Sequence, residues 1–141
     1  MRIGLNYRFN LTNRFNFLMQ NKIIFWSLRL IPAVIMLQTL FFKFLAAPES
    51  VYIFSTLGAE PFGRIISGIV ELVAAILLLI PRFSVYGAML AIGTMSVAIL
   101  SHLLFLGINV KDDGGALFAM AVITFLCSAV VAWQQKNTIF A

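Results

Sequence analysis

A few ionisable side chains lie inside long apolar stretches of this chain, and these are the residues that could do chemistry. Glu71 lies in the middle of GRIISGIVELVAAILLLIP, and Arg64 precedes it by seven residues. Lys43 and His102 lie in the neighbouring apolar stretches. A charge at the centre of a bilayer costs at least about 2.5–3.5 kcal/mol on insertion scales, and such residues mark proton relays and ligand sites. We therefore expect Glu71, Arg64, Lys43 and His102 to form a buried polar cluster with a function.

The competing interpretation of these residues is structural. A buried network of ion pairs can hold four helices in register with no chemistry of its own. His102 taken alone is typical of a hydrogen-bonded structural histidine. Arg29, Asp112 and Asp113 are secondary candidates, because Arg29 lies in the first apolar stretch and either aspartate could cap the last helix at its N-terminus.

Metal and thiol chemistry require more ligands than the sequence offers. One histidine, one cysteine and five acids are too few for a closed zinc site. The ligand sets of a di-iron carboxylate centre or a bis-histidine haem do not exist within one chain. Cys127 is alone, so no intrachain disulfide or C-x-x-C redox pair can form. No metal site is predicted.

The composition indicates which elements must position these residues. Of the 141 residues, 62% are hydrophobic and 11% charged, far from the mixture of a soluble domain. Runs of about 18 or more apolar residues are typical of transmembrane helices. The sequence therefore predicts an all-α integral membrane four-helix bundle, embedded in a lipid bilayer as a multi-pass protein, with spans at residues 23–47, 62–80, 83–106 and 116–133.

Charge sets the expected orientation. The net charge of +5 does not indicate nucleic acid, because the basic residues form no patch with interleaved aromatics on a soluble face. Basic residues instead gather at one end of the predicted bundle and acids at the other. The positive-inside rule therefore predicts that the N and C termini are both cytoplasmic.

Three segments are expected along the chain. Residues 1–22 form an N-terminal leader, either interfacial or disordered, and translation could start at Met1 or Met19. Residues 23–135 form the membrane domain, with a loop at 48–61 and a tight turn at 80–83. Residues 136–141 form a polar tail.

Helical periodicity predicts which faces turn inward. At 100° per residue, Arg64 and Glu71 share one stripe of the second span with Gly68 and Ala75. Helices in lipid use small residues for close approach, so this stripe should face the bundle. By the same argument, one set of residues on each of the other three spans should face the bundle. The sets are Arg29, Ala33, Met36, Leu40 and Lys43; Gly87, Ala91, Thr94, Ala98 and Ser101; and Ala121, Thr124, Ser128 and Ala132. By depth, Glu71 should lie near mid-bilayer and the other cluster members nearer the outer surface.

Several short stretches resemble the DoxX-like membrane proteins. They are RLIPAVIMLQTLFFK, GRIISGIVELVAAILLLIP followed by GAML, and DDGGALF. The resemblance spans residues 23–133 and implies a four-helix protein of the bacterial inner (cytoplasmic) membrane. The family's named member is similar to the small subunit of a thiosulfate:quinone oxidoreductase. Carried over to this chain, the implied polar set is Arg29, Lys43, Arg64 and Glu71.

The resemblance and the charge pattern together favour a redox-associated membrane subunit, linked to quinones or sulfur compounds. In this hypothesis Lys43, Arg64 and His102 hold a small anion or a quinone headgroup, and Glu71 relays a proton. An accessory subunit beside an oxidoreductase partner, or a homo-oligomer, fits better than a stand-alone enzyme. A small proton-coupled exporter and a structural scaffold remain the alternatives, although Arg64 would compete with a cationic cargo.

Overall fold

The computed structural model describes residues 11, 13–14, 17 and 20–139, and every regular element in these parts of the chain is a helix. Four of the helical segments are long and apolar enough to cross a membrane, which confirms the predicted all-α protein with four candidate spans. Most of the predicted leader lies outside the described residues. The elements are α2 (Lys22–Phe44), α3 (Pro48–Thr56), α4 (Phe62–Leu79), α5 (Ser84–Ser101), η1 (His102–Leu106) and α6 (Ala116–Ile139).

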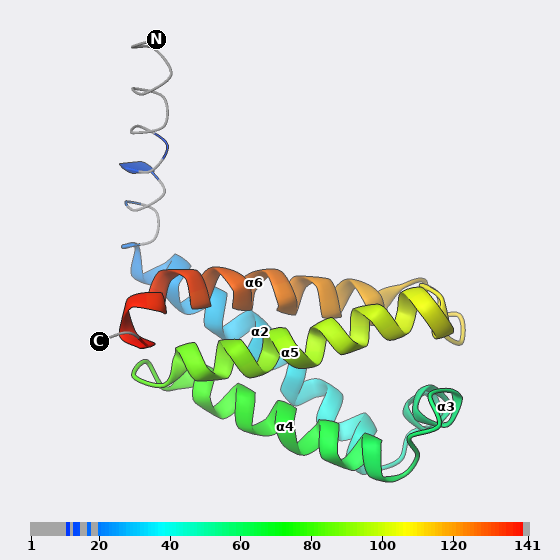
Figure 1. The fold of residues 1–141 in the computed structure, drawn as a ribbon. Helices are drawn as coiled ribbons and strands as arrows, with labels where there is room; N and C mark the ends of the chain where they lie inside the picture. The colour runs from blue at the N-terminus through cyan, green and yellow to red at the C-terminus, as the bar shows by residue number, and fades with distance from the viewer. Residues whose placement is uncertain (1–10, 12, 15–16, 18–19, 140–141) are drawn as a thin grey trace.

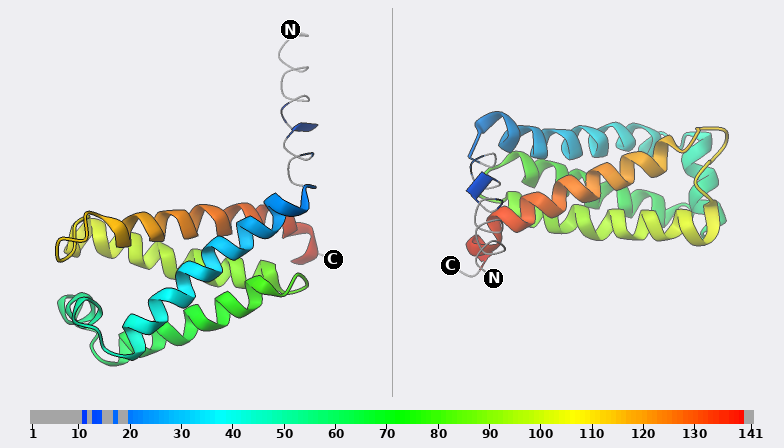
Figure 2. Two further views of the ribbon diagram at one scale, coloured as in Figure 1. Left: turned by 180° about the vertical axis from the view of Figure 1, so that it is seen from behind. Right: turned by 90° about the horizontal axis from the view of Figure 1, so that it is seen from above.

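The four long helices run side by side and alternate in direction (Figure 1). Each packs on two others: α2 against α4 and α6, and α5 against the same two helices. The short helix α3 lies across one end of the bundle, beside the loop between η1 and α6 (Figure 2). We call this the α3 end. The opposite end, where α2 begins and α6 ends, is the terminal end.

Local sequence sets where the helices begin and turn. Asn21 caps α2, because its side chain accepts a hydrogen bond of 3.0 Å from the backbone N–H of Ile23. Pro32 lies inside α2 without ending it. The predicted tight turn is present, since the N–H of Phe83 donates to the carbonyl of Ile80 at 2.9 Å. α4 and α5 are therefore antiparallel neighbours.

The small, polar stripes predicted from periodicity do face inward. Arg64, Gly68, Glu71 and Ala75 are buried on α4, while Ile66, Ile69 and Val73 are exposed on its outer side. The backbones of α4 and α5 approach closely at Gly87, where an added Cβ would lie 2.5 Å from the backbone nitrogen of Leu78. The core between the helices consists of small and flexible apolar residues: Ala33, Met36, Ala74, Ala75, Leu78, Ala88, Ala91, Met95, Ala121 and Val131.

Two elements differ from the sequence-based expectation. The segment predicted as a loop at 48–61 contains α3, which Pro48 opens at a position where its missing N–H costs nothing and where Glu49 favours the helix dipole. The third span does not end as a plain α-helix. It continues as the π-helical turn η1 and closes with the bond from the N–H of Gly107 to the carbonyl of His102, and π-turns of this kind occur at helix C-termini.

Candidate functional site

Glu71 and Lys43 form an ion pair between α4 and α2 in which Glu71 is buried and Lys43 is partly buried. The Lys43 Nζ lies 2.5 Å from Glu71 Oε1, and the two side chains are 14% and 6% exposed. Lys43 reaches Glu71 because it lies in the last turn of α2, while Glu71 lies half-way along α4 on the face turned to α2. The predicted contact between a central acid and a basic residue of another helix is therefore present.

Thr39 holds the second oxygen of the Glu71 carboxylate. Its hydroxyl lies 2.9 Å from Glu71 Oε2 and 2.8 Å from the carbonyl oxygen of Met36. A hydroxyl has one proton, so Thr39 can donate to only one of these two acceptors at a time. With Glu71 ionised, donation to the carboxylate is favoured, because a hydrogen bond to a charged acceptor is the stronger one.

Arg64 does not pair with Glu71. It binds Glu60, four residues earlier, with Nε–Oε distances of 2.9 and 3.0 Å and an Nη2–Oε1 distance of 2.7 Å. Its Nη1 also donates to the backbone carbonyl of Lys43. Seven residues of helical rise separate Arg64 from Glu71, and the nearer acid takes the guanidinium. Arg64 therefore anchors the end of α2 and holds the backbone of Lys43 in place.

His102 is buried in η1, away from the Lys43–Glu71 pair. Its Nδ1 lies 2.9 Å from the carbonyl oxygen of Gly107, and its ring meets Phe118 edge-on at a centroid distance of 5.7 Å. A carbonyl only accepts, so Nδ1 carries the proton and, in the neutral ring, Nε2 is an acceptor. The single predicted cluster is thus divided into two separate polar groups.

Asp113 is the cap of α6, and Asp112 is exposed. The Asp113 carboxylate accepts hydrogen bonds from the N–H groups of Val110, Gly115 and Leu117, at 3.0, 2.8 and 3.1 Å. Partial burial acts to raise the pKa of Asp113, but these three bonds and the nearby His102 outweigh it and lower the pKa below its usual value. The predicted capping role is confirmed for Asp113.

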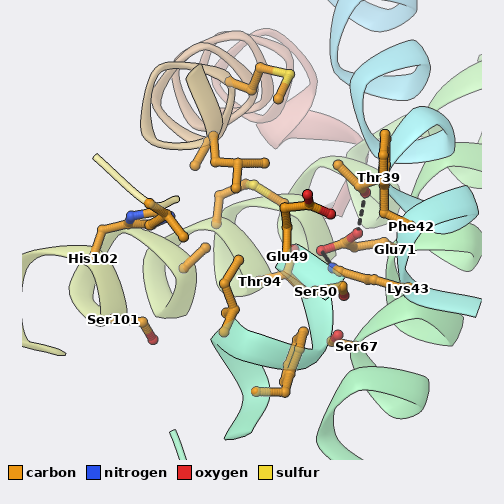
Figure 3. A pocket seen from close by; sticks show the side chains of 18 of the residues that line it. Thr39, Phe42, Lys43, Glu49, Ser50, Ser67, Glu71, Thr94, Ser101 and His102 are labelled. Atoms are coloured by element: carbon orange, nitrogen blue, oxygen red, sulfur yellow. Dashed lines mark hydrogen bonds and ion pairs between the residues drawn. The ribbon is translucent and has the colours of Figure 1, made fainter. Parts of the chain in front are cut away.

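A cavity of about 620 Å³ connects these polar groups at the α3 end. It is lined by side chains of all six elements and is mostly apolar, with contributions from Phe54 of α3, Met95 of α5 and Leu117 of α6. Figure 3 shows Lys43, Glu71 and Thr39 meeting on one side, with His102 on the other. Its charged lining residues are two lysines and three acids: Lys43, Lys111, Glu49, Glu71 and Asp113.

Arg29 lies outside this cavity, toward the terminal end. Its side chain is 1% exposed, and none of its three guanidinium nitrogens has a hydrogen-bond partner. The guanidinium lies over the ring of Phe25, with Cζ 3.6 Å from the ring centroid. Arg29 therefore belongs to neither polar group. Among the residues that the structure describes, no three His, Cys, Asp or Glu side chains form a possible metal site.

Sequence reasoning missed three parts of this site. The pairing of Glu60 with Arg64 could have been considered because the two residues are close in the chain, but Glu60 lies in the turn before α4, where helical spacing does not apply. The position of Thr39 beside Lys43 could also have been predicted, since Thr39 lies one helical turn before Lys43. The contribution of α3 to the cavity could not have been, because nothing in its nine residues specifies where it folds back.

No protein-family model, curated protein or solved structure matches the chain. The resemblance to DoxX-like proteins therefore stays a prediction, and the function has to be argued from the site itself.

Proposed function

We propose that the cavity binds the headgroup of a quinone and that the protein is a quinone-linked subunit of DoxX-like type in a bacterial inner membrane. The observation that carries this proposal is the ion pair of Lys43 and Glu71 in the wall of a largely apolar cavity of about 620 Å³. Ligand sites typically have about 300–1,000 Å³, with apolar walls and a few polar groups that fix the orientation.

The polar groups match the two chemical needs of a quinone. A quinone carbonyl accepts hydrogen bonds, and the ammonium of Lys43 has three donors, of which Glu71 takes one. Reduction of the carbonyl requires a proton, which the Lys43 ammonium can give up, and the carboxylate of Glu71 beside it can relay the proton that restores the ammonium. The electrons come from or go to an oxidoreductase partner, so the chain acts as an accessory subunit.

The charge of the cavity favours a neutral ligand over a small anion. With His102 neutral, its two ammonium groups and three carboxylates leave a net charge of −1. Lys43 is already neutralised by Glu71 at 2.5 Å, and Arg64 is held by Glu60. The structure therefore supports the quinone half of the sequence hypothesis better than the sulfur-anion half.

A proton-coupled exporter is less well supported. Such a protein needs its central carboxylate to exchange a proton for a cationic cargo. Lys43 is in direct contact with Glu71 and competes with any cationic cargo for the carboxylate. The sequence argument named Arg64 as the cation that competes for Glu71, whereas in the structure the cation in contact with Glu71 is Lys43.

Photoaffinity labelling of the full-length reconstituted protein tests the proposal. An azido-quinone should label peptides from α3, η1 and the facing part of α2. Ala98 lines the cavity, so Ala98→Phe should block labelling, whereas Leu100→Phe on the exposed side of the same helix should not.

Both variants should keep the thermal midpoint of the wild type, so that loss of labelling reports the cavity rather than misfolding. Equal labelling of wild type and Ala98→Phe, or labelling confined to lipid-facing residues, would overturn the proposal. Normal quinone turnover by the partner in a Glu71→Gln strain would remove the proton-relay part and leave binding alone.

A further inference from the structure

Arg29 is the most unusual residue of the structure, and the proposed function does not use it. A guanidinium stays charged in proteins and has five N–H donors. Here Nε, Nη1 and Nη2 are all buried, and none meets an acceptor. Contact with the Phe25 ring offsets only part of the cost of burying this charge, so the site calls for a hydrogen-bond acceptor that comes from elsewhere.

No acid of the chain can supply it. The sequence has five acids in all, and four of them lie in or beside the loops at the α3 end: Glu49, Glu60, Asp112 and Asp113. Glu71 is the nearest in depth, but its two oxygens already bind Lys43 and Thr39. Before α2, in the turn at 80–83 and at the end of α6, the described charged residues are basic, namely Arg14, Lys22, Arg82 and Lys136.

We infer that Arg29 is a second binding site, independent of the cavity, whose ligand is a phosphate group. Arg29 lies seven residues after the start of α2, which is about 10 Å at a rise of about 1.5 Å per residue. Since α2 is about 34 Å long by the same rise and the hydrocarbon layer about 30 Å thick, Arg29 lies several ångströms below the headgroups, a gap that its long side chain can help to bridge. Basic pockets between transmembrane helices bind anionic headgroups in this way, and a guanidinium can hold a phosphate through two parallel hydrogen bonds.

The aromatic neighbours define how the phosphate enters. Phe25 covers one face of the guanidinium, and Cζ of Arg29 lies 5.8 Å from the ring of Trp26, which is 39% exposed. The site is closed in this structure, so a ligand has to displace one of these rings. Trp26 forms the entry, because it is the neighbour that reaches the surface of the bundle.

Native mass spectrometry of the purified full-length protein tests the inference. The probes are phosphatidylglycerol, inorganic phosphate and diacylglycerol, which is a lipid without a phosphate. Wild type should retain phosphatidylglycerol or inorganic phosphate but not diacylglycerol. Arg29→Gln should bind about ten- to a hundredfold more weakly, corresponding to the loss of one or two charge-assisted hydrogen bonds. Arg82→Gln is the matched control, because it removes an exposed charge at the same end.

The preferred probe identifies the source of the phosphate, and either source supports the site. Thermal midpoints give a second readout that a merely structural arginine would not produce. Without phosphate, Arg29→Gln should be at least as stable as wild type, and added phosphatidylglycerol or inorganic phosphate should stabilise only the wild type and Arg82→Gln. Equal binding by Arg29→Gln and wild type, or no binding by wild type, would overturn the inference.

Discussion

The ion pair of Lys43 and Glu71 permits the sharpest prediction. We compare Lys43→Met, Glu71→Gln and the double variant. At 2.5 Å the attraction between the two charges is about 7 kcal/mol for an effective dielectric constant of about 20, and desolvation of both groups offsets much of it. Removing one partner of a buried pair typically costs about 3–5 kcal/mol, whereas replacing both is often near neutral.

The two single variants should not be equal. In Glu71→Gln the unpaired Lys43 can extend its long side chain toward the nearby α3 end, because it lies one residue before the end of α2. In Lys43→Met the unpaired carboxylate cannot reach the end of the bundle, since Glu71 lies nine residues, about 14 Å, from the start of α4. Lys43→Met should therefore be the more destabilising change, and the double variant should cost no more than about 2 kcal/mol.

The assay is reversible unfolding of the reconstituted protein, with the coupling free energy taken from the double-mutant cycle. The reasoning predicts a coupling of about 3 kcal/mol or more. A coupling within about 0.5 kcal/mol of zero would show that the two side chains do not interact in the membrane. If the double variant folds but is no longer labelled by the quinone, the pair has the proposed function and is more than a structural contact between helices. If labelling and phenotype are retained, the scaffold hypothesis is favoured.

Three further predictions concern packing, capping and anchoring. Gly87→Ala should destabilise the protein by about 1–3 kcal/mol, because the added Cβ would meet the backbone of α4. Gly93→Ala should stabilise it by up to about 1 kcal/mol, because an added Cβ there has nothing within 4 Å. Thermal or denaturant unfolding measures both changes. Asp113→Asn should lose about 1 kcal/mol of stability at pH 7, because the amide has one accepting oxygen in place of the two that bind the N–H groups of Val110, Gly115 and Leu117. Because folding lowers the Asp113 pKa, the wild type should lose this contribution as the pH falls below about 4, and the variant should show no such loss. Arg64→Lys cannot bind Glu60 and the Lys43 carbonyl together in the same way, so it should weaken quinone labelling while Glu71 stays in place.

The sequence was sufficient for the spans and their inward faces. Hydrophobic runs specify transmembrane helices directly, because the bilayer fixes their length. The stripe of Arg64, Gly68, Glu71 and Ala75 followed from helical periodicity alone. That Asp112 or Asp113 caps α6 followed from aspartates placed just before an apolar helix, and the structure identifies Asp113 as the cap.

The partners of the charged residues were not predictable in the same way. Lys43, Arg64 and His102 were all expected near Glu71, but a difference of one helical turn decides which base reaches the acid. That difference depends on the relative height of α2 and α4, which α3 and its flanking turns set. The lack of a hydrogen-bond partner for Arg29 depends on where the acidic residues of the other elements lie, and this cannot be predicted from the sequence pattern of α2.

The central claim is that Glu71 is an ionised carboxylate held by Lys43 in the cavity and that a bound quinone perturbs it. Infrared difference spectroscopy of the reconstituted protein, with isotope-labelled glutamate and with Glu71→Gln as the reference, measures this directly. The account predicts a carboxylate band that is absent from Glu71→Gln, changes in Lys43→Met and shifts when quinone is added. A protonated carboxyl band that neither Lys43→Met nor quinone alters would contradict it.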